Sequence, residues 1–84
     1  MQIKGNVVEF EWDKGNLDKS YAKHGITPKE AEEVFFDERS FVLSDVKHSQ
    51  KEERFIVVGS SLGGLNLFVV FAFRGKKVRV ISAR

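Results

Sequence analysis

The sequence is organised around Arg74-Gly75-Lys76-Lys77-Val78-Arg79-Val80-Ile81-Ser82-Ala83-Arg84, in which a tight turn leads into a strand pattern. Five cations and no acid lie in these eleven residues. The apolar residues would hold such a strand in a core, while Lys77, Arg79 and Arg84 would be available to an anionic partner. Whether that partner is RNA is the main question that the stretch raises.

Strand alternation sorts these residues onto two faces. One set is Lys77, Arg79, Ile81 and Ala83, and the other is Val78, Val80, Ser82 and Arg84. We expect the valines to face the helices, so that Arg79 points to the uncovered face beside Arg54 or Arg74. Arg84 then falls on the core side, at a strand end where it can swing outward.

Composition indicates a small globular protein. The 84 residues predict one domain, 1–84, with 42% hydrophobic and 31% charged residues, and no apolar run approaches the ~20 residues of a membrane span. There are no cysteines and only two histidines, which excludes disulfides and disfavours a structural zinc site, so we expect no metal and no cofactor. No signal-peptide pattern follows Met1, and a cytoplasmic setting is expected.

Charge is distributed unevenly along the chain. The first 42 residues hold six basic and nine acidic side chains and the last 42 hold eight and three, so the net charge changes from −3 to +5. Such asymmetry is typical of proteins with an anionic partner, although a run of charge by itself is more often a solvated face.

Two helices are expected in the first half of the chain. Asp13 would cap a helix from about residue 14 to residue 23, and Gly25 would end it. The start of the second helix is better specified, because Thr27-Pro28-Lys29-Glu30 combines an N-cap hydroxyl, a proline in the first turn and the glutamate of a capping box. This second helix should end near Phe36.

Strand patterns fill the rest of the chain. Residues 7–12 fit a short strand or an extended lead-in, and further strands are expected at 41–43, 54–60, 65–73 and 77–84. The strand at 65–73 is apolar on both faces and should be central. Short connections favour an antiparallel meander. The expected fold is therefore α+β, with two N-terminal helices packed on a four-stranded antiparallel meander sheet.

Two histidines are candidates for proton transfer near neutral pH. His24, next to Lys23, lies in the last turn of the first expected helix, where the sequence alone favours a role in capping that helix. His48 lies in the polar connection 45–54, whose carboxylates and arginine could carry protons and clamp a phosphate. Any exposed hairpin could contain such residues, so His48 could be a site residue or an ordinary residue of an exposed connection.

The glycines and aromatic residues give weaker signals. Gly59, Gly63 and Gly64 fit hairpin turns, because no glycine-rich motif opens a helix here. The eight phenylalanines fall mainly at expected core positions, and Phe68 is the candidate for an aromatic on the open face of the sheet.

A series of short motifs resembles one protein family. The motifs are Phe10-Glu-Trp-Asp13, Asn16, Lys23-His-Gly25, Ala31-Glu-Glu-Val-Phe35, His48-Ser49, Glu53-Arg54 and Arg79-Val-Ile-Ser-Ala-Arg84. In this order, and over nearly the whole chain, they resemble the BrnT family of bacterial toxins. The resemblance implies a ribonuclease toxin with a RelE-like fold, neutralised by a BrnA antitoxin that carries a ribbon-helix-helix DNA-binding domain.

The resemblance also implies which residues act. Those expected in catalysis are His24, Glu53, Arg54, Arg79 and Arg84. Those expected to bind RNA are Lys23, His48 and Ser82, to which the cationic strand adds Lys77. The expected partners are RNA and the antitoxin, with DNA bound only through the antitoxin.

The hypothesis that follows is a metal-independent endoribonuclease that inhibits translation. A ribose 2′-hydroxyl would attack the adjacent phosphate, which requires proton transfer and stabilisation of the charge on the phosphorane. Arginine suits the second task, because a guanidinium makes permanently charged, bidentate contacts with phosphate. His24 is the first choice for proton transfer and Glu53 the second.

The sequence departs from the family at its end. Relatives usually continue beyond Ser-Ala-Arg into a basic C-terminal helix, so we expect a RelE-like fold without that helix and a weakened RNA cleft or antitoxin contact. One alternative function is an inactive or truncated toxin-like module that binds an antitoxin or nucleic acid without catalysis. Another is a plain nucleic-acid-binding domain, whose affinity would fall steeply with salt.

Overall fold

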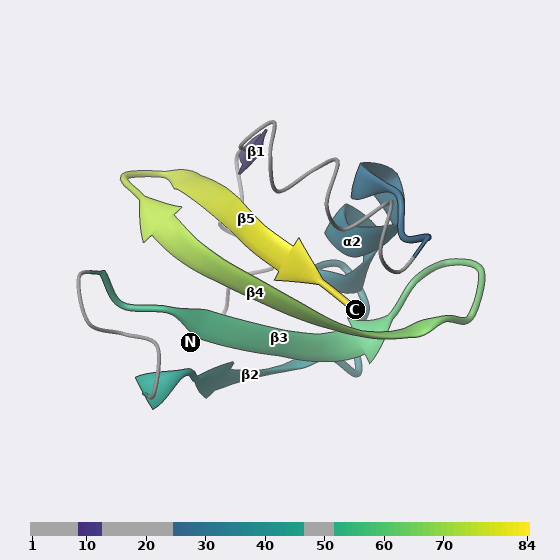
Figure 1. The fold of residues 1–84 in the computed structure, drawn as a ribbon. Helices are drawn as coiled ribbons and strands as arrows, with labels where there is room; N and C mark the ends of the chain where they lie inside the picture. Colours follow the sequence, from purple (N-terminus) through teal and green to yellow (C-terminus); the bar gives the residue numbers. More distant parts are fainter. Residues whose placement is uncertain (1–8, 13–24, 47–51) are drawn as a thin grey trace.

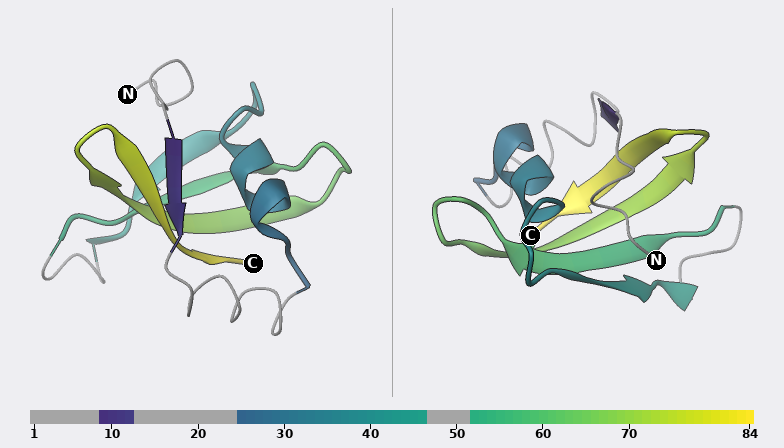
Figure 2. Two further views of the ribbon diagram at one scale, coloured as in Figure 1. Left: turned by 90° about the horizontal axis from the view of Figure 1, so that it is seen from above. Right: turned by 180° about the vertical axis from the view of Figure 1, so that it is seen from behind.

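The fold is built on a five-stranded sheet with a short helix on one face (Figures 1 and 2). The computed structural model describes residues 9–12, 25–46 and 52–84. Its elements are β1 (Glu9–Trp12), α2 (Pro28–Val34), β2 (Phe41–Ser44), β3 (Phe55–Ser60), β4 (Asn66–Arg74) and β5 (Lys77–Ala83). The strands lie in the order β1-β5-β4-β3-β2, so the most apolar strand, β4, is central as predicted.

The expected fold class is wrong in its sheet. β2 to β5 pair with one another antiparallel, but β1 adds a fifth strand that is parallel to β5, so the sheet is mixed. Glu9 pairs with Lys77 and Trp12 with Val80 at the two ends of this ladder. The physical reason is that β5 would otherwise leave a row of unpaired backbone groups at the sheet edge, and β1 covers that row.

The fold class is also wrong in its helical layer. The described residues contain one helix, of seven residues, and are mostly β. The other expected helix, at 14–23, lies outside the described residues. In the described part of the chain, no helix has the length and apolarity needed to cross a bilayer.

Helix α2 begins where its sequence predicts, at Pro28, directly after the N-cap residue Thr27. The Thr27 hydroxyl accepts a hydrogen bond from the Glu30 backbone N–H at 3.2 Å, and Glu30 Oε1 accepts one from the Thr27 backbone N–H at 2.9 Å. The bond from the Thr27 backbone N–H, together with one that the Thr27 hydroxyl donates to Glu30 Oε1 at 3.0 Å, favours the charged carboxylate and lowers the pKa of Glu30 below its ordinary value of 4.5. A helix this short is not stable alone, so the cap and the packing below hold it in place.

The core lies between α2 and the face of the sheet that α2 covers. Its buried side chains are Ile26, Ala31, Val34, Phe35, Val57, Leu67, Val69, Phe71, Val78, Val80 and Ala83. Phe35 makes edge contacts with Phe71 and Phe10, at centroid distances of 5.0 and 5.1 Å. The Trp12 indole N–H donates to Glu32 Oε2 at 2.9 Å, which ties β1 to α2.

Gly59 does not lie in a turn, as its residue type suggested, but inside the strand expected at 54–60. In this part of β3, the chain that leaves α2 approaches the sheet. A Cβ at this position would be 2.8 Å from Ser40 Cβ and 3.1 Å from Val34 Cγ1, so the close approach requires glycine. Gly64, by contrast, is in the β3–β4 turn with a φ of +88°.

Candidate nucleic-acid site

A β-bulge in β5 determines on which face the polar side chains of this strand lie. Val80 pairs with Phe71 and Ser82 pairs with Val70, so Ile81 is an extra residue without a direct partner on β4. The bulge shifts the alternation by one residue, and Ala83 is the residue that enters the core. The expected sides of Ser82, Ala83 and Arg84 are therefore wrong. Ser82 and Arg84 lie on the face away from α2, which we call the open face.

Strand pairing orders the side chains of the open face into two adjacent rows. The first row is Phe41, Val58, Phe68 and Arg84, and the second is Leu43, Ile56, Val70 and Ser82. The rows are two residues apart on every strand, so they share one face. Each row starts with apolar side chains on β2 and ends with a polar side chain at the end of β5.

A cavity of about 270 Å³ opens on this face. Its lining residues are Asp45, Arg54, Ile56, Val70, Ile81, Ser82 and Arg84. Two guanidinium groups and one carboxylate give the lining an excess positive charge, and the strand side chains beside them are aliphatic. A concave site with an apolar base and a few convergent charges is typical of ligand-binding sites, and here the charge favours an anion.

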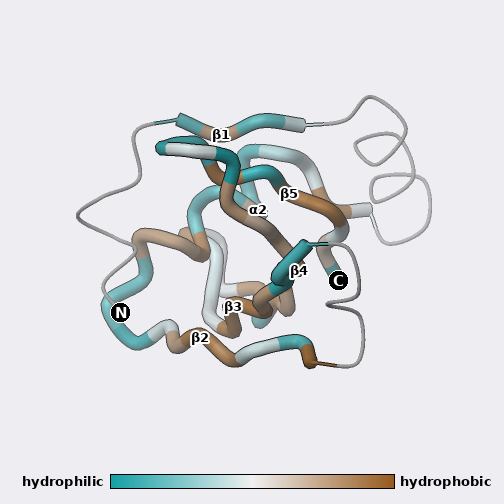
Figure 3. Tube along the Cα trace, turned by 90° about the vertical axis from the view of Figure 1, so that its left-hand side faces the viewer, coloured by the Kyte–Doolittle hydropathy of each residue, from teal (hydrophilic) through white to brown (hydrophobic). Residues whose placement is uncertain are grey.

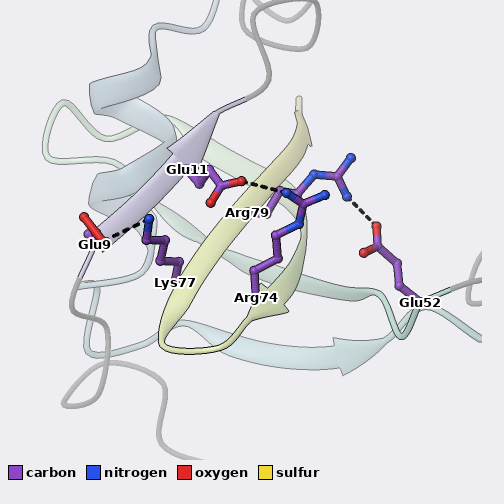
Figure 4. Close-up of polar contacts among 6 residues, drawn as sticks. All are labelled: Glu9, Glu11, Glu52, Arg74, Lys77 and Arg79. Carbon is purple, nitrogen blue, oxygen red and sulfur yellow. Dashed lines mark hydrogen bonds and ion pairs between the residues drawn. The ribbon is translucent and has the colours of Figure 1, made fainter.

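Arg79 lies beside this cavity and binds a carboxylate from the segment that precedes β3. Its Nη1 donates a hydrogen bond to Glu52 Oε1 (Figure 4). Glu52 comes two residues before Arg54, and Arg79 comes just before the bulge, so both partners adjoin residues that line the cavity. The side chains are 19% and 34% exposed, respectively, so the pair is partly shielded from water.

Two further ion pairs lie where β1 borders β5. Lys77 Nζ is 3.4 Å from Glu9 Oε1, and Arg74 Nη1 is 3.0 Å from Glu11 Oε1 (Figure 4). Because these side chains are well exposed, each pair contributes little to stability. Their main effect is to place acidic side chains beside the cations at this end of the sheet.

The structure brings together four of the predicted site residues. Arg54, Ser82 and Arg84 line the cavity, and Arg79 lies beside it. Lys77 is further along β5, in its ion pair with Glu9. The remaining described candidate, Glu53, is exposed and makes no hydrogen bond or ion pair with other described residues.

Three predicted site residues cannot be placed in this geometry. His24, Lys23 and His48 lie outside the described residues. Among the residues that are described, no three His, Asp or Glu side chains come close enough together to hold a metal ion.

Sequence reasoning considered both carboxylates that precede Arg54 but selected Glu53, whereas Glu52 is the one that contacts Arg79. The signal for it is the alternation of β3, because residues 52, 54, 56 and 58 continue one face of that strand, whereas 53, 55 and 57 continue the other. Ile56 and Arg54 both line the cavity on the open face. Extending the same period backward selects Glu52 in preference to its neighbour Glu53.

The match to known proteins covers most of the chain. A family model described as "Ribonuclease toxin, BrnT, of type II toxin-antitoxin system" matches residues 12–84. The chain belongs to the BrnT family. The resemblance of the sequence motifs to BrnT is thereby confirmed, and membership of a type II toxin-antitoxin system implies an antitoxin partner.

A solved structure supports the same BrnT assignment. The crystal structure of the ribonuclease toxin BrnT from Brucella abortus is similar with a TM-score of 0.70 and 26% sequence identity. The similarity covers 90% of this chain and 92% of that chain, so it extends over the sheet and the open face. Comparison with curated proteins gave no match.

Proposed function

We propose that this BrnT family member is a toxin that cleaves RNA as a metal-independent endoribonuclease and thereby inhibits translation. The observation that carries the proposal is that Arg54 and Arg84 line one cavity of the open face, with Arg79 held by Glu52 beside it. RNA presents a phosphate at every nucleotide, and guanidinium groups are well suited to bind it, because they offer parallel N–H donors.

The proposed reaction is attack by a ribose 2′-hydroxyl on the adjacent phosphorus. A bond forms between the 2′-oxygen and phosphorus while the bond from phosphorus to the 5′-oxygen of the next nucleotide breaks. One proton leaves the 2′-oxygen and one is delivered to the 5′-oxygen. The products are a 2′,3′-cyclic phosphate and a 5′-hydroxyl, and no oxidant or metal ion is required.

The arginines would stabilise the negative charge that builds on the phosphorane. Arg54 and Arg84 line the cavity, so a phosphate held there would lie between positive groups and beside the Ser82 hydroxyl. Fixed donors that face developing charge in a partly dehydrated site typically account for rate factors on the order of 10²–10³ each.

Arg79 would take part while still held by Glu52. A guanidinium has donors on three nitrogens, and Nη1 is the one that binds Glu52. Nη2 and Nε can therefore bind a phosphate without breaking the ion pair. In this proposal Glu52 is a positioning residue, which orients Arg79 and does not itself touch the substrate.

Proton transfer is assigned to His24, with Glu53 as the second choice. An imidazole can accept and donate protons near neutral pH, which suits the removal of one proton and the delivery of another. The assignment rests on the Lys23-His24-Gly25 motif of the sequence. Lys23, His48 and Lys77 would add positive charge along the RNA backbone.

The proposed protein partner is a BrnA-like antitoxin with a ribbon-helix-helix domain. It would bind the toxin, suppress cleavage and connect the complex to DNA. An RNA substrate and an antitoxin of this kind both fit a cytoplasmic protein.

Incubation of the pure protein with defined RNAs, with and without EDTA, tests the proposal. We expect cleavage that survives the chelator and leaves 2′,3′-cyclic phosphate and 5′-hydroxyl ends. The His24→Ala protein should lose activity, while Arg39→Ala, which changes an exposed arginine in the turn after α2, should keep it. Absence of cleavage on every RNA, with tight antitoxin binding, would favour the inactive toxin-like module. Cleavage that EDTA abolishes would exclude the metal-independent mechanism.

A further inference from the structure

The open face carries a group of exposed apolar side chains next to the cationic cavity. Phe41 is 54% exposed, Leu43 is 50% exposed and Phe68 is 50% exposed, although all three belong to strands. Ile56, Val58 and Val70 lie between them in the two rows. We call these six residues the apolar patch. Figure 3 shows hydrophobic stretches running along β2, at the edge of the sheet, as well as through the strands that form the core.

The apolar patch is not part of the core. The core residues of the same strands, such as Val57 and Val69, are 2% and 0% exposed and face α2. Large apolar side chains gathered on one exposed sheet face generally mark a surface that another molecule covers.

The patch and the cavity meet without a gap. Phe68 and Arg84 exchange two backbone hydrogen bonds, of 2.6 and 2.9 Å, so their side chains stand next to each other in the first row. Ile56 and Val70 belong to the patch and also line the cavity. A ligand that covers the patch therefore reaches Arg84 and the cavity mouth.

We propose that the apolar patch is the docking surface for the antitoxin of this type II system, and that the docked antitoxin covers the cationic cavity. The inference rests on the proposed function, because the cavity is taken as the RNA site. It specifies the chemistry of the partner segment, which presents apolar side chains to Phe41, Leu43 and Phe68 and carboxylates to Arg84 and its neighbours.

A protein segment fits this surface better than RNA. The patch is two-thirds aliphatic, and only Phe41 and Phe68 offer aromatic faces on which a base could stack. Apolar contacts at the centre with charged contacts at one edge are the usual composition of a protein–protein interface. The excess positive charge of the cavity lining supplies the charge complementarity for an acidic segment and speeds its association.

The proposal predicts that part of the apolar patch contributes to antitoxin binding alone. Phe41 and Leu43 lie on β2 and do not line the cavity, so they should matter for the antitoxin alone. Arg84 lies at the border and should matter for both. The antitoxin would then inhibit by covering the cavity, and RNA and antitoxin would compete for the toxin.

Two substitutions with matched controls test the proposal. The full-length Phe41→Asp and Leu43→Asp proteins are compared with Phe36→Asp and Leu62→Asp, which place the same substitution at residues 57% and 86% exposed outside the patch. The probe is the purified antitoxin encoded in the same operon, titrated by calorimetry. RNA cleavage is measured with and without it, and circular dichroism monitors folding.

We expect Phe41→Asp and Leu43→Asp each to weaken antitoxin binding at least tenfold while RNA cleavage by the free toxin stays within twofold of the wild type. Their cleavage should resist inhibition by the antitoxin, and the two controls should bind it normally. Both Asp variants binding the antitoxin with wild-type affinity would overturn the proposal. So would a loss of RNA cleavage in both variants with unchanged antitoxin binding, which would make the patch an RNA surface.

A failure of the proposed function can be distinguished from a failure of the docking proposal. If the wild type does not cleave RNA, the calorimetric comparison still reports whether the antitoxin occupies the patch. Hydrogen–deuterium exchange of the wild-type protein, with and without the antitoxin, gives a second measurement that does not depend on any variant. Bound antitoxin should slow the deuterium exchange of residues 41–45, and unchanged exchange there would count against the patch.

Discussion

Arg79 on β5 donates a hydrogen bond to Glu52, a residue that precedes it by 27 positions and lies just before β3. The bond connects the segment before β3 to β5 across β4, beside the cationic cavity. A single guanidinium is thereby held at the cavity border before any ligand arrives, which reduces the conformational entropy lost on binding a phosphate.

Replacing Glu52 should therefore impair cleavage without removing any group that touches RNA. Glu52→Gln weakens a charge-assisted hydrogen bond, and we expect RNA cleavage to fall by about tenfold. Glu53→Gln should cause a smaller loss, and Glu38→Gln, an exposed glutamate after α2, should cause none. Initial rates on one RNA at several concentrations measure the effect. Equal rates for the wild type and Glu52→Gln would show that Glu52 does not position Arg79.

Gly59→Ala should destabilise the fold, because a methyl group at this position would meet Ser40 Cβ at 2.8 Å. Overpacking of this kind costs about 1–3 kcal/mol. The control is Gly63→Ala, where the nearest atom is 3.8 Å away and φ is not positive. Urea denaturation of both proteins gives the comparison, and a Gly59→Ala midpoint no lower than that of Gly63→Ala would refute the close-packing argument.

The stability that Glu30 provides should depend on pH. Its pKa is lowered in the folded protein, so the carboxylate contributes fully above its ordinary value of 4.5 and progressively less as the pH falls through the folded value. The difference in unfolding free energy between the wild type and Glu30→Gln should be larger at pH 7 than at pH 3. Denaturation at the two pH values measures this, and a difference that is the same at both would contradict the assignment.

Trp12→Phe should loosen the attachment of β1 to α2. The substitution keeps an aromatic ring but removes the N–H that donates to Glu32 Oε2 at 2.9 Å. We expect a loss of about 1 kcal/mol in unfolding free energy. Glu32→Gln keeps an acceptor and should lose less, so thermal unfolding that ranks the two variants in the opposite order would argue against this bond.

The parts of the fold that depend on local sequence could be predicted. Thr27 and Glu30 specify the start of α2 because both halves of the capping box lie within four residues. The central place of β4 follows from its apolar composition. The pairing of β1 with β5 could not be predicted, because Glu9 and Lys77 are far apart in the sequence and the parallel ladder depends on where the edge of the sheet falls.

In the candidate site, too, the residue types could be predicted from the sequence, whereas their arrangement depends on pairing between strands. The types of residue at Arg54, Arg79 and Arg84 suggested phosphate binding, but the place of Arg84 on the same face depends on the bulge at Ile81, which arises from pairing with β4. Alternation read along β5 alone placed Ser82 and Arg84 on the wrong side. Gly59 was assigned to a turn for a similar reason, since the contact with Ser40 that requires glycine is between distant segments.

The most direct test of the proposed RNA site is the single-turnover rate of RNA cleavage by Arg79→Ala in the presence of EDTA, with Arg39→Ala as control. Removing a preorganised donor to the phosphorane should lower the rate on the order of 10²-fold, while the control cleaves like the wild type. A wild-type rate for Arg79→Ala would contradict the account, because the arginines of the open face would then not stabilise the reaction.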